Sequence, residues 1–228
     1  LSWHLYALPH IEQDPLYMKI SQAAGAYTMT NKNNPYGLTK IPLYLCPSAT
    51  IDRMQQNAAH FVNAPDLVGT ESPYTVHYYG VLGPKGTNAA DGTAYDVDTD
   101  GSHGGVSLEG AMQKHKGVRL SEIKDGTSGT FLVGELSWTN NVTGTRYRSW
   151  LRGGAATQYE SAGAKNVVNA INTPGVATFN DISFGSQHLG GTNFAFADGS
   201  IRFVQQSIPL ATYKALASRN GGEVASDN

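Results

Sequence analysis

The sequence predicts an α+β domain in which an antiparallel β-sheet packs with helices and carries long loops. Only 15% of the 228 residues are charged, while Gly (26) and Tyr (12) are abundant, which is typical of loop-rich, strand-rich secreted proteins. Alternating runs of β-branched and aromatic residues predict several strands. Apolar residues at helical spacing predict short helices near both ends of the chain.

The N-terminal part predicts two short helices and one strand. Apolar residues at helical spacing indicate a helix over 2–11, interrupted by Pro9, which has no backbone donor. An Asp-Pro pair opens a second helix over 14–20, because Asp is a preferred N-cap and Pro fits the first helical position. Residues 41–48, IPLYLCPS, lie between prolines and predict a short edge strand.

The middle of the chain predicts strands separated by loops. Residues 74–82, YTVHYYGVL, are β-branched and aromatic, and residues 130–136, TFLVGEL, predict a buried strand after a turn at 125–128. A further strand is expected over 146–151. The segments expected to be irregular are the polar loop 83–105 and the small, polar segment 153–184.

The C-terminal part predicts a hairpin followed by a helix. Residues 193–197 and 200–204 alternate between apolar and polar positions, and Asp198-Gly199 lies between them. An Asp-Gly pair between alternating runs is a strong hairpin signal, because Gly takes a positive φ at low steric cost. Apolar residues on one face then predict a terminal helix over 207–218, capped by a serine at its start.

Composition and charge limit the classes of function. The net charge of −2 gives no basic surface for nucleic acid or anionic lipid. No apolar run reaches the ~18 residues of a membrane span. Cys46 is the single cysteine, so no internal disulfide forms, and we interpret it as a small buried hydrophobic residue. We expect one domain, 1–228, with an acidic loop insertion at 83–105, a hairpin at 185–204 and a terminal helix at 207–218.

Four blocks carry a resemblance to a known family. They are SWHLYALPHIEQDPLYMKI at 2–20, IPLYLCPS at 41–48, DGTSGTFLVGE at 125–135 and FGSQHLGGTNFAFADGSIRFV at 184–204. Nine residues separate His188 from Asp198-Gly199, and this spacing matches the C-terminal signature of bacterial prepilin-type, processing-associated proteins, a family of unknown function. Gly129 stands where that family usually has Asn.

The resemblance implies a pilin-like secreted protein. Such proteins resemble type IV prepilins, with a cleavable leader, an apolar helix of about membrane-spanning length and a globular α+β head. This chain starts without Met, has no signal peptide and shows no apolar helix. We therefore expect it to be the head alone, with the N-terminal pilin helix absent.

An acidic loop is the candidate metal site in the sequence. Asp96, Asp98 and Asp100 alternate and are followed by Gly and Ser102, a pattern that lets a short loop curl around a hard cation such as Ca²⁺. The match to an EF-hand is incomplete, because position twelve is Ser107 instead of Glu. A calcium-binding loop of another kind and a merely solvated acidic loop both remain open.

His188 and Asp198 are candidates for a catalytic pair, because a carboxylate can orient an imidazole so that the imidazole acts as a general base. No nucleophile motif supports it, so we expect Asp198 to bond turn amides and His188 to tie the incoming loop to the hairpin. Histidines at pairwise metal-ligand spacing are also missing, so zinc has no support from sequence. Glu135 and Asp125 form a possible carboxylate pair, for which solvated or turn-capping roles are favoured.

Three functions follow from these observations. The first is a non-enzymatic pilin-like or pseudopilin-like structural subunit at the cell surface, which self-associates or joins related subunits in a filament or secretion-associated fibre. The second is a calcium-dependent, adhesin-like module that binds glycans through its tryptophans and tyrosines. The third is a hydrolase that uses His188 and Asp198. A membrane contact is expected only through the absent N-terminal helix.

Overall fold

The structure is a computed structural model of the chain. It describes residues 1–22, 35–53, 68, 70–99, 103–137, 149–154, 161–176 and 178–223. Within these residues, no helix is both long enough and apolar enough to cross a membrane.

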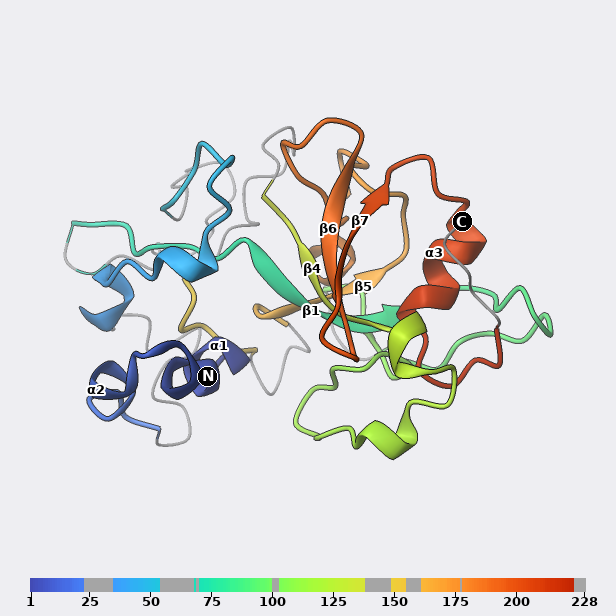
Figure 1. Ribbon diagram of the computed structural model, residues 1–228, viewed down its shortest axis with the longest axis horizontal. Helices are drawn as coiled ribbons and strands as arrows, with labels where there is room; N and C mark the ends of the chain where they lie inside the picture. Colours follow the sequence, from blue (N-terminus) through green and yellow to red (C-terminus); the bar gives the residue numbers. More distant parts are fainter. Residues whose placement is uncertain are drawn as a thin grey trace.

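A five-stranded sheet forms the centre of the molecule, in the strand order β5-β1-β4-β6-β7 (Figure 1). Its neighbouring strands are antiparallel except for β1 and β5, which run parallel. The α+β class is therefore confirmed, with one parallel pair. A separate two-stranded sheet joins β2 and β3. The bounds are β1 Tyr78–Pro84, β2 Val97–Asp98, β3 Val106–Ser107, β4 Phe131–Glu135, β5 Ala164–Val167, β6 Gly191–Phe196 and β7 Ile201–Gln205.

The helices are short and lie toward opposite ends of the molecule. Figure 1 shows α1 and α2 at one end of the molecule and α3 at the other, with the sheet between them. The bounds of the α-helices are α1 Trp3–Ala7, α2 Asp14–Tyr17 and α3 Leu210–Ala217. The 3-10 turns are η1 Leu8–Ile11, η2 Pro35–Leu38, η3 Pro42–Tyr44, η4 Leu120–Glu122, η5 Thr127–Gly129 and η6 Phe179–Asp181.

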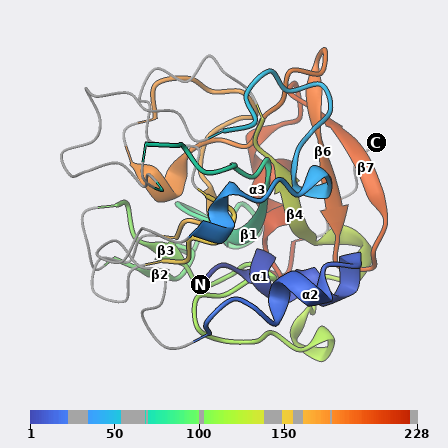
Figure 2. The same cartoon turned by 90° about the vertical axis from the view of Figure 1, so that its left-hand side faces the viewer.

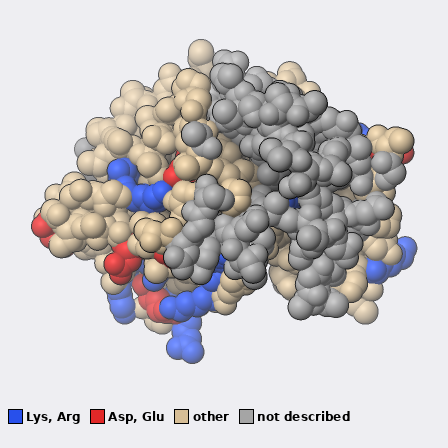
Figure 3. Space-filling view, turned by 180° about the vertical axis from the view of Figure 1, so that it is seen from behind, with Lys and Arg blue, Asp and Glu red and all other residues tan. Residues whose placement is uncertain are grey.

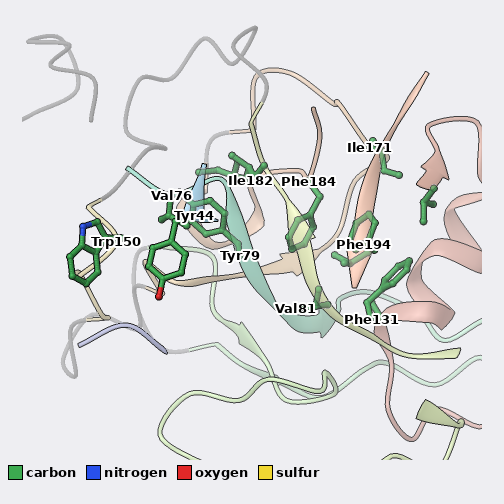
Figure 4. Close-up of a cluster of buried hydrophobic side chains, with 14 of the residues drawn as sticks. Tyr44, Val76, Tyr79, Val81, Phe131, Trp150, Ile171, Ile182, Phe184 and Phe194 are labelled. Carbon is green, nitrogen blue, oxygen red and sulfur yellow. The ribbon is translucent and has the colours of Figure 1, made fainter. Parts of the chain in front are cut away.

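One apolar core joins the helices to the sheet. Tyr213 of α3 is buried against Phe131 and Phe194, with ring centroids 5.8 Å apart in each pair. At the opposite end of the cluster, Tyr44 packs against Trp150 (Figure 4). Each end of the core is thus built on aromatic rings, which bury large apolar areas and set the spacing between layers.

The C-terminal hairpin forms as predicted. β6 and β7 are antiparallel and Gly199 has a φ of 86°, a region that side-chain-bearing residues rarely adopt. The Asp198 carboxylate accepts from the backbone N–H (2.9 Å) and the hydroxyl (2.7 Å) of Ser200, which closes the turn. The terminal helix is shorter than expected, because Pro209 provides its N-cap position in place of Ser207.

Three other predictions of secondary structure were wrong. Residues 41–48 form the turn η3 instead of an edge strand, because their backbone donors bond locally, as Leu45 N–H does to the Pro42 carbonyl (3.0 Å). The segment 153–184, expected to be irregular, contributes β5 to the sheet. The loop 83–105 contains β2. Most of the strand expected over 146–151 lies outside the described residues.

Charges on the described surface are mixed in sign. In the view from behind, blue and red side chains lie close together in one region, and most other described residues are uncharged (Figure 3). This agrees with the net charge of −2.

Candidate metal centre

Three segments that are distant in sequence meet beside the end of β4. Cys46 lies just after η3, Glu135 is the last residue of β4, and His188 lies in the loop that precedes β6. Their donor atoms all lie within 4.8 Å of one another. Each segment belongs to a different one of the blocks described above for their resemblance to prepilin-type proteins. The fold therefore brings one polar side chain from each of three blocks to a common point.

The backbone holds these three segments in place. The Cys46 N–H donates to Nδ1 of His77 (2.9 Å), and the His77 N–H donates to the Tyr44 carbonyl (2.8 Å). The Gly185 N–H donates to the Glu135 carbonyl (2.9 Å), so the loop of His188 runs beside the end of β4. The main chain of Cys46 is thus bound to His77, and the main chain of Gly185 to that of Glu135, so hydrogen bonds outside the three ligand side chains position the site.

The loop of His188 is closed by a serine. The Ser186 hydroxyl accepts from the His188 N–H (3.1 Å) and donates to the Gly191 carbonyl (2.7 Å), which joins the loop to the start of β6. Ser186 therefore makes the bond from this loop to the hairpin, whereas the His188 N–H bonds within the loop. The His188 imidazole points to Cys46 and Glu135 instead of to the hairpin.

Glu135 is a fully buried carboxylate, so its expected solvated role was wrong. Oε1 accepts from the Ser137 hydroxyl (2.6 Å) and Oε2 accepts from the Asn193 amide (3.2 Å). The basic group next to it is the His188 imidazole, with Nε2 3.5 Å from Oε1. A buried carboxylate is costly unless a cation or several donors compensate its charge.

Nε2 of His188 faces two groups at once. It lies 3.5 Å from the Cys46 Sγ and 3.5 Å from the Glu135 Oε1. The distance to the carboxylate exceeds the 2.7–2.9 Å usual for a charge-assisted N–H···O bond, and a single N–H cannot point at both acceptors. No single well-aligned hydrogen bond therefore accounts for this contact. The sulfur, nitrogen and oxygen atoms lie around a common centre, as the ligand atoms of a metal ion do.

The environment of Cys46 does not activate its thiol. Burial raises the pKa of the Cys46 thiol, and the neighbouring Glu135 raises that pKa further. Catalytic thiolates show the opposite, a pKa lowered by nearby positive charge. Burial raises the pKa of the Tyr78 hydroxyl to about 12, with Cys46 and Glu135 as further causes.

The structure does not bring His188 and Asp198 together. His188 precedes β6 and Asp198 follows it, so the two residues lie at opposite ends of that strand. Asp198 bonds Ser200 in the turn, as expected. Asp125 likewise caps a turn, accepting from the backbone N–H groups of Gly221 (2.7 Å) and Gly222 (3.0 Å), and it lies at the other end of β4 from Glu135.

The acidic loop is described only in part. Asp96 is exposed and Asp98 lies in β2, whereas Asp100 and Ser102 lie outside the described residues. Calcium binding at this loop stays a prediction. Of the tryptophans considered for glycan stacking, Trp150 is fully buried and Trp138 lies outside the described residues. Glycan binding also stays a prediction.

Sequence reasoning missed this group of three because no two of its members are close in sequence. Metal motifs are recognised by short spacings, and Cys46 and Glu135 are 89 positions apart (135 − 46). The available signal was the position of each residue inside a separate block of one resemblance.

Comparison with known proteins places the chain in a family. The family model described as a protein of unknown function (DUF1559) matches residues 1–211, a range that includes Cys46, Glu135 and His188. No curated protein and no solved structure is significantly similar to the chain. The chain belongs to the DUF1559 family of proteins of unknown function.

Proposed function

We propose that the chain is the extracellular head of a pilin-like structural subunit, which works by associating with copies of itself and not by catalysis. The charge-poor composition and the blocks that resemble prepilin-type proteins support this proposal. The fold supports it too, since helices pack on a sheet that closes with the signature hairpin.

The observation that carries the proposal is the exposed edge of the sheet. β7 is the last strand in the order, and it lies at the outside of the molecule in Figure 2. Ile201 and Phe203 are 73% and 47% exposed, and residues two apart on a strand point to the same side. Leu189, in the loop before β6, is 99% exposed.

Nothing in β7 protects this edge. Proteins usually blunt exposed edge strands with charged residues, prolines or bulges, because an open edge pairs with other chains. The charged residue of β7 is Arg202, and its guanidinium donates to the Ser128 carbonyl (2.7 Å) and lies 4.0 Å from the Phe196 ring centroid. The charge is therefore turned toward its own sheet. A second copy of the chain offers the same apolar edge, and such self-complementary contacts form dimers or longer assemblies.

Two observations support the non-enzymatic part of the proposal. His188 and Asp198 are separated by the length of β6, and the pKa of the Cys46 thiol is raised instead of lowered. The first pair lacks the contact between its members that catalysis requires, and the thiol lacks the lowered pKa of a catalytic nucleophile.

The test replaces the two exposed apolar residues of β7. Sedimentation velocity over a range of concentrations should show the wild-type chain associating, and Ile201→Lys with Phe203→Lys should remain monomeric. Because both side chains are exposed, the substitutions should change stability by less than about 1 kcal/mol. Leu120→Lys is the matched control, since Leu120 is 67% exposed on η4. A wild-type chain that stays monomeric, or a double variant that still associates, would contradict the proposal.

A further inference from the structure

We propose that Cys46, Glu135 and His188 bind one Zn²⁺ ion, which fastens the segment after η3 and the loop before β6 to the end of β4. This proposal does not rest on self-association through β7.

Bond geometry is the first argument. Zinc bonds of about 2.3 Å to sulfur and about 2.0–2.1 Å to nitrogen and oxygen, at tetrahedral angles, place sulfur and nitrogen about 3.6 Å apart and nitrogen and oxygen about 3.4 Å apart. The Sγ to Nε2 and Nε2 to Oε1 distances are both 3.5 Å. The spacings thus fit two ligand pairs around one zinc ion without large movement.

The donor set is the second argument. A thiolate, an imidazole and a carboxylate are the three ligand types that proteins use for zinc. Sulfur disfavours hard cations such as Ca²⁺ and Mg²⁺, so this site differs in chemistry from the acidic loop at 96–102. A zinc ion would also place positive charge beside the buried Glu135 carboxylate, whose one neighbouring basic group among the ion pairs of the described residues is the His188 imidazole.

Neighbouring side chains orient the Glu135 ligand, and one side of the site faces solvent. Ser137 and Asn193 donate hydrogen bonds to the Glu135 carboxylate, and such outer partners orient a metal-binding carboxylate. Cys46 is 3% exposed and the His188 side chain is 31% exposed, so solvent reaches the site from the His188 side. Three protein ligands leave one tetrahedral position, which a water molecule fills from that side.

The single cysteine fits this role. The chain contains no second cysteine with which Cys46 could form an internal disulfide. In an oxidising compartment, where small domains are often stapled by disulfides, one zinc ion joins three distant segments in a comparable way.

The experiment measures bound metal and thermal stability on the same chain. Purified protein is dialysed against equimolar Zn²⁺, Ca²⁺ and Mg²⁺ and then against buffer, and its metal content is measured by mass spectrometry. Wild type should retain one zinc per chain, and a zinc chelator should lower the Tm by about 10 °C when the free zinc had been about a thousandfold above Kd. The Co²⁺ form should show a thiolate-to-cobalt charge-transfer band.

The variants include a substitution at a partly exposed ligand, because replacing a fully buried ligand could unfold the chain. His188→Gln changes a partly exposed side chain and should abolish both zinc retention and the chelator-induced Tm shift. Cys46→Ser should remove the charge-transfer band. His10→Gln, at an exposed histidine of η1, is the matched control and should behave as wild type. Equal zinc retention in wild type and His188→Gln, no zinc retention in either, or retention of Ca²⁺ or Mg²⁺ in place of zinc would each overturn the assignment.

Discussion

His4 is a buried histidine that the fold keeps neutral. Its Nε2 donates to the Tyr78 carbonyl (2.8 Å) and its Nδ1 accepts from the Ser2 hydroxyl (2.6 Å), while the ring stacks on Trp3 with centroids 3.9 Å apart. Burial lowers the pKa of His4 from 6.5 to about 3. A charged ring would lose its water shell without gaining an anionic partner among these contacts.

This shift predicts a loss of stability in acid. Between pH 6.5 and about 3 the unfolded chain binds a proton at His4 that the folded chain does not, so the free energy of unfolding falls as the pH falls. The contribution of this one group is up to about 1.4 kcal/mol for each pH unit. Urea unfolding across this range should show a shallower pH dependence for His4→Gln than for wild type. Identical slopes would contradict the buried neutral state of His4.

At the scale of elements, the β6–β7 turn is the clearest case in which local sequence determines local structure. Gly199 has a φ of 86°, and a Cβ added there would meet no atom within 4 Å. A substitution therefore acts through backbone strain and not through a clash. Gly199→Val should lower the free energy of unfolding by about 1–2 kcal/mol or more, measured by chemical denaturation. Gly199→Asn should cost less, because Asn tolerates this region, and wild-type stability in the Val variant would refute the strain argument.

Elements with local signals were predicted, and elements that depend on distant contacts were not. The hairpin, β4 and α1 follow from turn residues, alternation and helical spacing in their own sequences. β5 is small and polar in sequence, and it becomes a strand because it pairs with β1 across a long connection. Residues 41–48 have strand-like composition, but prolines at 42 and 47 remove backbone donors, and the segment turns instead.

The candidate site could not be predicted for the same reason, because its three residues are far apart in the sequence. The hairpin roles of Asp198 and Gly199 follow from neighbouring residues. The contact of His188 with Cys46 and Glu135 depends on three chain segments, whose meeting is set by the sheet order and the pairing of β1 with β4. No local pattern encodes such a contact.

Two metal sites of different chemistry are predicted in the molecule, a Ca²⁺ site in the acidic loop and a Zn²⁺ site beside the end of β4. Metal-selective chelators distinguish them. If the loop carrying Asp96 and Asp98 binds Ca²⁺, a calcium-selective chelator should lower the Tm of wild type and leave that of Asp96→Asn with Asp98→Asn unchanged. A zinc-selective chelator should lower the Tm of both proteins. An unchanged wild-type melt with the calcium chelator would remove the acidic-loop prediction and leave the zinc assignment intact.

We infer that one zinc ion joins three distant segments of the molecule. A crystal of the zinc-loaded protein, with diffraction measured just above and just below the zinc absorption edge, tests it most directly. One anomalous peak should lie between the Cys46 Sγ, the Glu135 Oε1 and the His188 Nε2, at bonding distance from each atom. A map without a peak at that point, with His188 hydrogen-bonded to Glu135 alone, would contradict it.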